Sequence, residues 1–370
     1  MSHPRTLTSL QLVKERSMSD FASLSYRQQT GRLRRLATAA LETYPLKVQK
    51  LQLVTHRENT TFRLVATGHN SADQRYMPDH HLLRIHRPGK HGPARTAERA
   101  ILSELEWLSA LRRDTGLAVP DPVSNRQALL TTVAETDGVP EPRVVSVLRW
   151  LPGRRAGKVR PVHLARLGSA MALLHEHADR WQRPEGFTRR TWDWDMLFGH
   201  RMDFGAVTAA EAFELVPADH QSTFRRVAEH ARGVMQGLGH GADVFGLIHA
   251  DLHLDNVVFW RSAPQVIDFD DCGFGHRMYD VAVALWEHRT AADFPSLQSA
   301  FVAGYEQHRP LRPEHMALLD SFIAAREVTI GLWLVGMAQA NPSFREGLSD
   351  ELAFTADVVR NKLDLPDVWP

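Results

Sequence analysis

The sequence contains a single cysteine, Cys272, so no disulfide bond can form within its 370 residues. Disulfide bonds are typical of oxidising compartments, and their exclusion favours a cytoplasmic protein. Residues 1–13 lack the apolar stretch of a secretory signal. The most apolar run, residues 322–340, is interrupted by Arg326 and Glu327. We therefore predict a buried helix there and no membrane span.

An excess of charge of one sign is also missing. The 44 Lys and Arg side chains balance 43 Asp and Glu side chains, for a formal net charge of +1. Such a chain has no general attraction to nucleic acid or to membranes. Residues 1–50 are the local exception, because they carry nine basic and three acidic side chains around an amphipathic helical pattern. We expect this helix to pack on the following domain; a nucleic-acid or membrane surface is the alternative.

Residues 48–150 have the pattern of a small unit built from strands and one helix. Strand-like runs are separated by polar turns that contain Gly or Pro, and one run has its apolar residues at helical spacing. The predicted strands cover residues 51–54, 60–66, 81–86, about 127–133 and 143–150, and the predicted helix covers residues 97–111. We expect a five-stranded antiparallel sheet with one inserted helix.

After Gly153 the pattern becomes mainly helical. Helices are predicted within residues 164–177, within 208–237 and from 279 onwards, and a short hairpin is predicted at 256–269. The chain is thus predicted to have three parts: an N-terminal helical extension of residues 1–47, a nucleotide-binding lobe of residues 48–150, and a helical lobe of residues 151–370 with the catalytic loop and the acceptor site.

The most informative segment of the chain consists of two short motifs. They are HADLHLDN at positions 249–256 and IDFDD at positions 267–271. Phosphoryl transfer needs one carboxylate to orient the attacking hydroxyl, and an amide with a second carboxylate to hold Mg²⁺ on ATP. Asp251, Asn256 and Asp268 supply this set, and the predicted hairpin would bring the three side chains together. The spacing therefore predicts a kinase.

Seven motifs together resemble a known superfamily. In chain order they are Asn59–Phe62, Leu83–Ile85, Glu104, Leu148–Gly153, Leu167–His175, His249–Asn256 and Ile267–Gly275. They resemble the aminoglycoside phosphotransferase/choline kinase superfamily, and most of all its branch with the bacterial stress-response Ser/Thr kinase and type II homoserine kinases. The resemblance covers residues 30–340. It implies an α+β, bilobal protein-kinase-like fold, with a small antiparallel-sheet N-lobe, a larger mainly helical C-lobe, and ATP and Mg²⁺ as cofactors.

The resemblance also implies roles for residues of the helical lobe. Asp251 matches the catalytic Asp, which would align the substrate hydroxyl with the γ-phosphate. Asn256 and Asp268 match the two metal ligands. His249 is a second candidate catalytic residue; in a loop of this kind a histidine more often braces the backbone than transfers protons.

Other residues near these motifs have less certain roles. Asp270 and Asp271 would assist a second Mg²⁺, face the acceptor, or only cap the next turn. Asp280 matches a position that we interpret as bracing the catalytic loop. The aromatic and acidic run Trp192–Phe198 would line the acceptor site or anchor a loop on the core.

The nucleotide-binding residues of the first lobe depart from the usual pattern. The superfamily usually has a lysine on the third strand, whereas this chain has Arg84 at the matching position. Arginine can neutralise phosphates and pair with Glu104; the alternative gives the role to Lys50 or Lys90. The segment Asn59-Thr-Thr-Phe62 lies where a lid over the nucleotide belongs, although an ordinary turn is equally compatible with it.

These observations favour an ATP-dependent kinase that acts on a hydroxyl of a small metabolite. A Ser/Thr protein kinase of the stress-response type is a close variant. A catalytically silent pseudokinase would lack at least one of Asp251, Asn256 and Asp268, and all three are present. A phosphohydrolase built on Asp268 and Asp270 lacks the nucleophile loop. No nucleic-acid or membrane partner is expected, and the sequence does not predict the acceptor or the oligomeric state.

Overall fold

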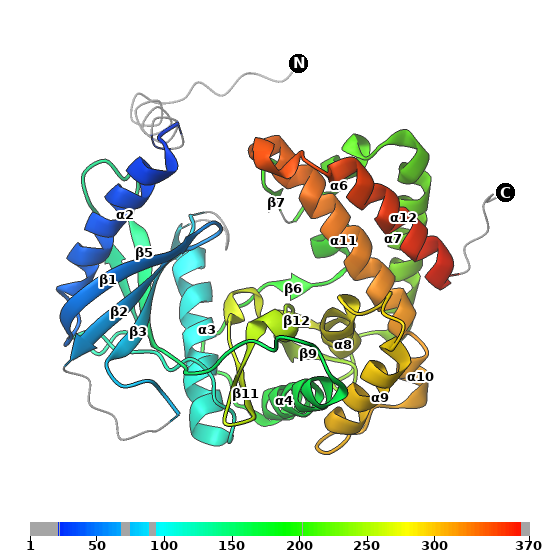
Figure 1. Cartoon of the computed structure of the whole chain (residues 1–370), viewed down its shortest axis with the longest axis horizontal. Helices are drawn as coiled ribbons and strands as arrows, with labels where there is room; N and C mark the ends of the chain where they lie inside the picture. The colour runs from blue at the N-terminus through cyan, green and yellow to red at the C-terminus, as the bar shows by residue number, and fades with distance from the viewer. Residues whose placement is uncertain (1–20, 22, 68–74, 89–93, 202, 364–370) are drawn as a thin grey trace. The chain divides into compact units, whose positions relative to one another are not determined.

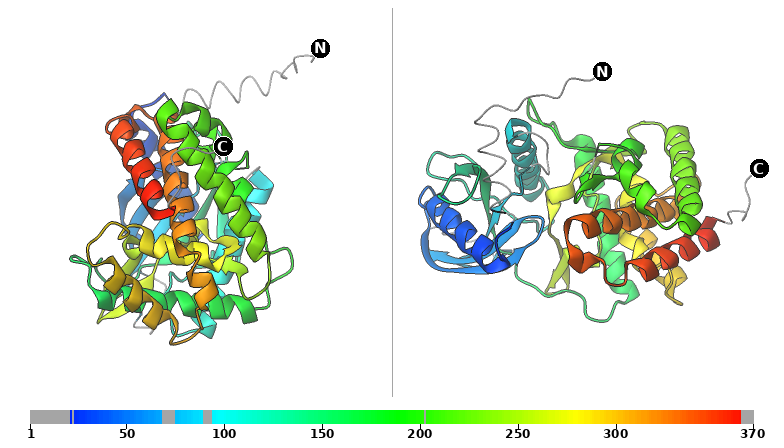
Figure 2. Two further views of the ribbon diagram at one scale, coloured as in Figure 1. Left: turned by 90° about the vertical axis from the view of Figure 1, so that its right-hand side faces the viewer. Right: turned by 90° about the horizontal axis from the view of Figure 1, so that it is seen from above.

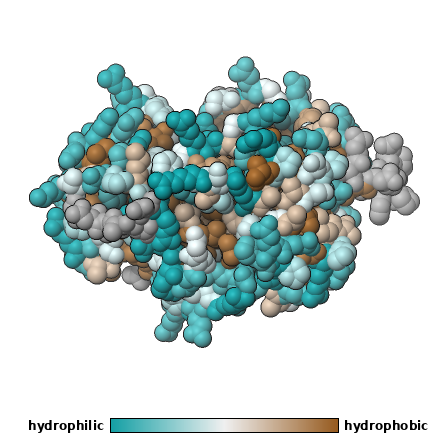
Figure 3. All heavy atoms as spheres, turned by 60° about the horizontal axis from the view of Figure 1, so that its bottom comes forward, coloured by the Kyte–Doolittle hydropathy of each residue, from teal (hydrophilic) through white to brown (hydrophobic). Residues whose placement is uncertain are grey.

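The computed structural model describes residue 21 and residues 23–67, 75–88, 94–201 and 203–363 (Figure 1). The chain forms two compact units. The first contains residues 1–109 and 120–152, and the second contains residues 110–119 and 153–370. On the face drawn in Figure 3, hydrophilic residues predominate, in keeping with a mean hydropathy of −0.30.

The first unit is built on a five-stranded sheet. Its strands are β1 (Lys47–His56), β2 (Thr60–Thr67), β3 (His80–Ile85), β4 (Thr131–Ala134) and β5 (Arg143–Arg149), in the order β1-β2-β3-β5-β4. All pairs of neighbours are antiparallel. Along β2, fully buried residues alternate with partly buried ones, as expected for a sheet with one face on the core. The predicted five-stranded antiparallel sheet is confirmed.

Helix α2 (Tyr26–Leu41) covers the buried face of this sheet. Leu33 and Leu36 of the helix belong to the same core as Phe62 and Leu64 of β2. The prediction that the basic N-terminal helix packs on the following unit is confirmed by this core. Helix α3 (Ala94–Asp114) begins in the first unit, and its last residues are grouped with the second.

One strand of the first unit is shorter than predicted. The expected strand at 127–133 begins only at Thr131, because the preceding residues form a turn. The side-chain oxygen of Asn125 accepts hydrogen bonds from the backbone N–H groups of Gln127 and Leu129. Ala128 has a φ of 62°, which is incompatible with an extended strand.

The second unit is mainly helical. Its helices are α4 (Pro161–Arg180), α5 (Trp194–Phe198), α6 (Ala209–Leu215), α7 (Ala218–Leu238), α8 (Arg277–Trp286), α9 (Phe294–Tyr305), α10 (Pro313–Met316), α11 (Leu319–Ala340) and α12 (Leu348–Leu363). Short strands complete it: β6 (Thr191–Trp192), β7 (Asp203–Phe204), β8 (Val207–Thr208), β9 (Phe245–Ile248), β10 (Val257–Trp260), β11 (Ala263–Val266) and β12 (Gly273–His276). With the sheet of the first unit, they confirm the predicted α+β class.

Helix α11 is the central helix of this unit. It packs against α6, α7, α8 and α12, and both views in Figure 2 show it beside α12. Most of its side chains are buried on all sides, which confirms the predicted buried helix in residues 322–340. Among the helices in the described part of the chain, none combines the length and apolar character needed to cross a membrane.

Candidate active site

The two motifs of the second unit meet at the base of a hairpin. Strand β9 leads into the loop that carries Asp251, and a short 3₁₀ turn (Leu254–Asn256) follows. Strands β10 and β11 then pair in antiparallel fashion, with Val257 opposite Val266. The ladder continues beyond the strands, because the Ile267 N–H donates to the carbonyl of Asn256 at 3.0 Å. Asp268 directly follows Ile267, so Asn256 and Asp268 lie at the same end of the hairpin.

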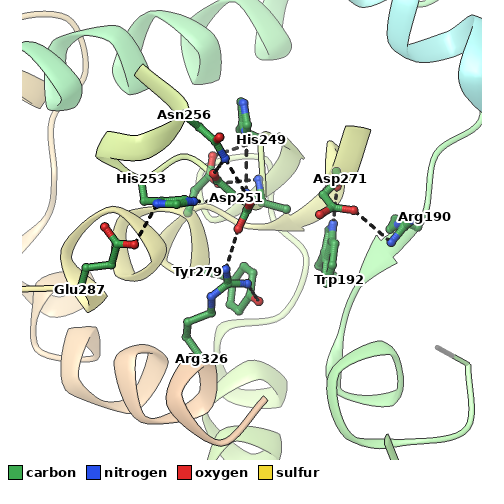
Figure 4. Close-up of polar contacts among 12 residues, drawn as sticks. Arg190, Trp192, His249, Asp251, His253, Asn256, Asp271, Tyr279, Glu287 and Arg326 are labelled. Atoms are coloured by element: carbon green, nitrogen blue, oxygen red, sulfur yellow. Dashed lines mark hydrogen bonds and ion pairs between the residues drawn. The ribbon is translucent and has the colours of Figure 1, made fainter. Parts of the chain in front are cut away.

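Asp251 is held by three side chains (Figure 4). The Asn256 amide nitrogen donates to the Asp251 backbone carbonyl at 2.8 Å and to Oδ2 at 3.1 Å. Arg326 Nη2 donates to Oδ1 at 2.6 Å. His253 Nε2 lies 3.6 Å from Oδ2. About a quarter of the Asp251 side chain (26%) remains exposed, so a substrate group can still reach it.

Opposite charges set the ionisation of this cluster. Burial alone would raise the pKa of Asp251, but its contact with His253 and the charge of Arg326 lower that pKa well below its usual range. Burial would likewise lower the pKa of His253, yet its contacts with Asp251 and Glu287 raise that pKa to about 9. The contact with His253 lowers the pKa of Glu287 despite burial. At neutral pH the cluster therefore holds carboxylates and a protonated imidazole.

His249 is fully buried; its ring lies 4.6 Å from the ring of Phe269, and its two ring nitrogens contact the backbone. Its Nε2 donates to the carbonyl of Ile267 at 3.1 Å, and its Nδ1 accepts the Asp251 N–H at 3.4 Å. Burial lowers the pKa of His249, which keeps the ring neutral. These contacts agree with a bracing role, in which the ring ties the loop to the strand end that precedes Asp268.

Asp280, at the start of α8, holds the same loop. Its carboxylate accepts the N–H of His249 at 3.0 Å and the N–H of Ala250 at 2.6 Å. His175 Nε2 lies 3.0 Å from Oδ2, and the hydroxyl of Tyr305 lies 2.8 Å from the other ring nitrogen. The predicted bracing of the loop by Asp280 is confirmed. Ala250 has a φ of 67°, so the loop depends on such support.

Asp270 and Asp271 follow Asp268 in a 3₁₀ turn (Phe269–Asp271). The Asp270 side chain is buried. Asp271 Oδ1 lies 3.4 Å from Arg190 Nη1, and the Trp192 indole N–H donates to the Asp271 carbonyl at 2.8 Å. Trp192 is itself buried, which agrees with the interpretation that this aromatic run anchors a loop.

In the first unit, Arg84 and Glu104 form a buried ion pair between β3 and α3. Lys50, the alternative, is exposed on β1, and Lys90 lies outside the described residues. Asn59 is in the turn before β2, and its side-chain oxygen accepts the Arg87 N–H at 3.0 Å. Phe62, by contrast, points into the core of this unit. Its side chain is fully buried, and its backbone lies opposite Leu53 of β1 and Leu83 of β3 in the sheet, so the prediction that Phe62 contacts the nucleotide is wrong.

The sequence model of the phosphotransferase enzyme family matches residues 51–318. The chain belongs to this family. A homoserine kinase of Phenylobacterium zucineum is 30% identical over 59% of the chain and 62% of that protein. The solved structure of a microcompartment-associated aminopropanol kinase is 29% identical, covers 89% of the chain and 97% of that protein, and has a TM-score of 0.74. The amicoumacin kinase hAmiN, solved with AMP-PNP and Ca²⁺, has a TM-score of 0.66 at 19% identity, over 88% of the chain and 96% of that protein.

The comparisons thus show that this chain is an enzyme of the kinase type and that it has the predicted protein-kinase-like fold. Kinases of this kind need a nucleotide donor and a divalent metal ion. Asn256 fits a metal ligand, because its amide nitrogen makes both contacts with Asp251 and its oxygen is the donor that a metal prefers. Asp268 would supply a carboxylate beside it. Asn and Asp oxygens are hard donors that suit Mg²⁺.

A second group of potential ligands lies beside Asp251. His253, Asp255 and Glu287 each bring one ligand atom within 4.8 Å of the others. His253 Nδ1, however, lies 3.0 Å from a carboxylate oxygen of Glu287. The raised pKa of His253, about 9, keeps the imidazole protonated at neutral pH, and a protonated imidazole cannot bind a metal. We interpret this group as an ion pair.

Sequence reasoning missed three charged residues around Asp251. His253 lies two residues after Asp251 in the same motif, and this proximity could have indicated that the two side chains interact. Arg326 is an isolated arginine in an apolar helix, an unusual residue in such a run. Glu287, after the end of α8, had no signal in the sequence.

Proposed function

We propose that this phosphotransferase moves the γ-phosphate of ATP, with Mg²⁺, to the hydroxyl of a small metabolite that also carries an amine. The observation that carries the proposal is the contact between Asp251 and Asn256, with Asp268 beside Asn256 at the end of the hairpin. The amino-alcohol class is supported by the names of two relatives, a homoserine kinase and an aminopropanol kinase.

In this reaction Asp251 accepts a hydrogen bond from the acceptor hydroxyl and aligns it with the γ-phosphate. Because the transition state of phosphoryl transfer is loose, alignment contributes more than removal of the proton. The lowered pKa of Asp251 is compatible with this role, since an ionised carboxylate is always available as an acceptor. Asn256 and Asp268 would hold the metal ion, which neutralises charge on the phosphates.

The first unit would bind the nucleotide. Arg84 would contact the phosphates, as a lysine usually does in this superfamily. Glu104 would keep the guanidinium in place. Asn59 and the turn between β1 and β2 would form the lid. In this proposal residues 48–150 act as the nucleotide-binding part, residues 151–370 carry the catalytic loop and acceptor site, and residues 1–47 form an extension. The single cysteine supports a cytoplasmic location.

The proposal is tested by ATP consumption and product detection with a panel of acceptors. Aminopropanol, homoserine, an aminoglycoside and a generic protein substrate are each incubated with the full chain and Mg²⁺-ATP. We expect a phosphorylated product from an amino alcohol, and no product from the Asp251→Ala variant. Transfer to the protein substrate alone would replace the proposal with a Ser/Thr protein kinase, and no transfer to any acceptor would contradict it.

A further inference from the structure

One arginine of α11 reaches the carboxylate of the catalytic loop. Arg326 Nη2 donates to Asp251 Oδ1 at 2.6 Å, although the two residues are 75 positions apart. The other oxygen, Oδ2, accepts from Asn256 at 3.1 Å and lies 3.6 Å from His253. The two oxygens are thus held by different parts of the fold, Oδ2 by its own loop and Oδ1 by α11 (Figure 4).

Because Arg326 is buried, its charge depends on this contact with Asp251. Only 11% of its side chain is exposed, and a buried guanidinium needs an anionic partner. Its other contacts are neutral, with the hydroxyl of Tyr279 at 3.4 Å and the ring of Trp286 at 5.7 Å. Glu327, the next residue, forms its own ion pair with a different arginine. Asp251 is therefore the carboxylate that balances the charge of Arg326.

A carboxylate needs such a partner if its orientation matters. The terminal torsion of aspartate is soft, so the backbone alone does not fix the plane of the two oxygens. Hydrogen bonds on both oxygens do fix that plane. Each carboxylate oxygen accepts two hydrogen bonds, so Oδ1 can hold Arg326 and an incoming hydroxyl at the same time.

We propose that Arg326 is a positioning residue, which acts through Asp251 to align the acceptor hydroxyl. This inference rests on the proposed function. Without Arg326, Oδ1 loses the hydrogen bond that fixes it, and the hydroxyl is aligned less well. Transfer to the acceptor should slow by about 10²-fold, the cost of a small misplacement in an aligned reaction. Nucleotide binding should not change, because the contacts of Arg326 lie around Asp251 and not in the first unit.

A double-mutant cycle with Asp251 tests the inference. The rate of phosphate transfer from Mg²⁺-ATP to aminopropanol, and to homoserine, is measured for wild type, Arg326→Gln, Asp251→Asn and the double variant. We expect Arg326→Gln to lower kcat by about 10²-fold while the KM for ATP stays unchanged. In the Asp251→Asn background it should cause no further loss, because its effect passes through the carboxylate. Arg326→Lys, which keeps the charge, should recover part of kcat.

Arg289→Gln is the matched control. Arg289 is also a buried arginine over the ring of Trp286, at 4.9 Å, but it pairs with Glu327. The Arg289→Gln substitution should lower the melting temperature and leave kcat of the folded protein unchanged. If Arg289→Gln lost as much kcat as Arg326→Gln, the effect of Arg326 would be explained by its packing and not by its contact with Asp251.

Three results separate the inference from the function on which it rests. An unchanged kcat in folded Arg326→Gln overturns the inference alone, as does a further loss of the same size in the double variant. A wild-type protein that phosphorylates no acceptor of the full panel contradicts the proposed function, and the inference falls with it.

Discussion

At the scale of the single residue, Asn256 and Asp268 should determine the metal requirement of the reaction. Asn256→Ala removes one hard oxygen donor, so we expect the Mg²⁺ concentration for half-maximal activity to rise by about tenfold or more, which corresponds to about 1.4 kcal/mol. Asp268→Ala removes a charged donor and should have the larger effect. Mg²⁺ titration of kcat measures both. Asn341→Ala, at the exposed end of α11, is the control and should keep the wild-type requirement.

The residue scale also shows where sequence reasoning ends. Asp251, Asn256 and Asp268 could be named because 17 positions separate the first from the last and the strands between them are short. Arg326 could not, because its contact with Asp251 joins residues 75 positions apart and depends on how α11 packs. A long apolar run predicts that a helix is buried, but it does not predict which of its polar side chains reaches a site.

At the scale of the element, the close contact of α4 and α9 depends on two glycines. A methyl group on Gly304 would collide with the carbonyl of Ala165, and one on Gly168 would collide with that of Phe301. We expect Gly304→Ala to destabilise the protein by about 3 kcal/mol, because overpacking forces the two backbones apart. Gly233→Ala, on the exposed side of α7 with open space around it, should instead stabilise by about 0.5–1 kcal/mol. Urea unfolding compares the two, and equal effects would contradict the packing argument.

The start of α8 supports the loop that carries Asp251 through a single side chain. Asp280→Ala would leave the N–H groups of His249 and Ala250 and the ring of His175 without their acceptor. Buried groups left unsatisfied cost about 1–3 kcal/mol each, so we expect a large fall in melting temperature together with a loss of kcat. Asp280→Asn keeps one acceptor oxygen and should fall between Ala and wild type. An Asp280→Ala variant that is more stable than wild type, or that has a normal kcat, would show that the loop keeps its conformation without Asp280.

Prediction from sequence was better for the elements than for their ends. The spacing of apolar residues gave the five strands and the long apolar run gave the buried helix, because both signals are local in the sequence. The predicted start of β4 was wrong, because the side chain of Asn125 accepts hydrogen bonds that hold the preceding residues in a turn. Such a side-chain contact with the backbone competes with the strand pattern and is not visible in the periodicity.

For the molecule as a whole, buried histidines should make the stability depend on pH. Burial lowers the pKa of seven histidines in the described part of the chain: His56, His163, His175, His177, His249, His276 and His288. Below about pH 6.5 the unfolded chain binds protons that the folded chain does not, so the free energy of unfolding falls as the pH falls. Each such histidine contributes at most about 1.4 kcal/mol per pH unit to that slope. The raised pKa of His253, about 9, acts in the opposite sense, because its contribution is complete below about pH 6.5 and is lost as the pH rises through 9.

The free energy of unfolding should therefore be greatest near neutral pH and fall on both sides. Urea unfolding measured from pH 5 to pH 10 tests this expectation. His253→Gln should weaken the alkaline decline, since the variant has no imidazolium to lose, and it should keep the acid decline, which belongs to the other histidines. A free energy of unfolding that is constant between pH 7 and pH 5 would mean that these rings take up protons equally well in the folded protein. It would contradict the burial that sets their pKa values.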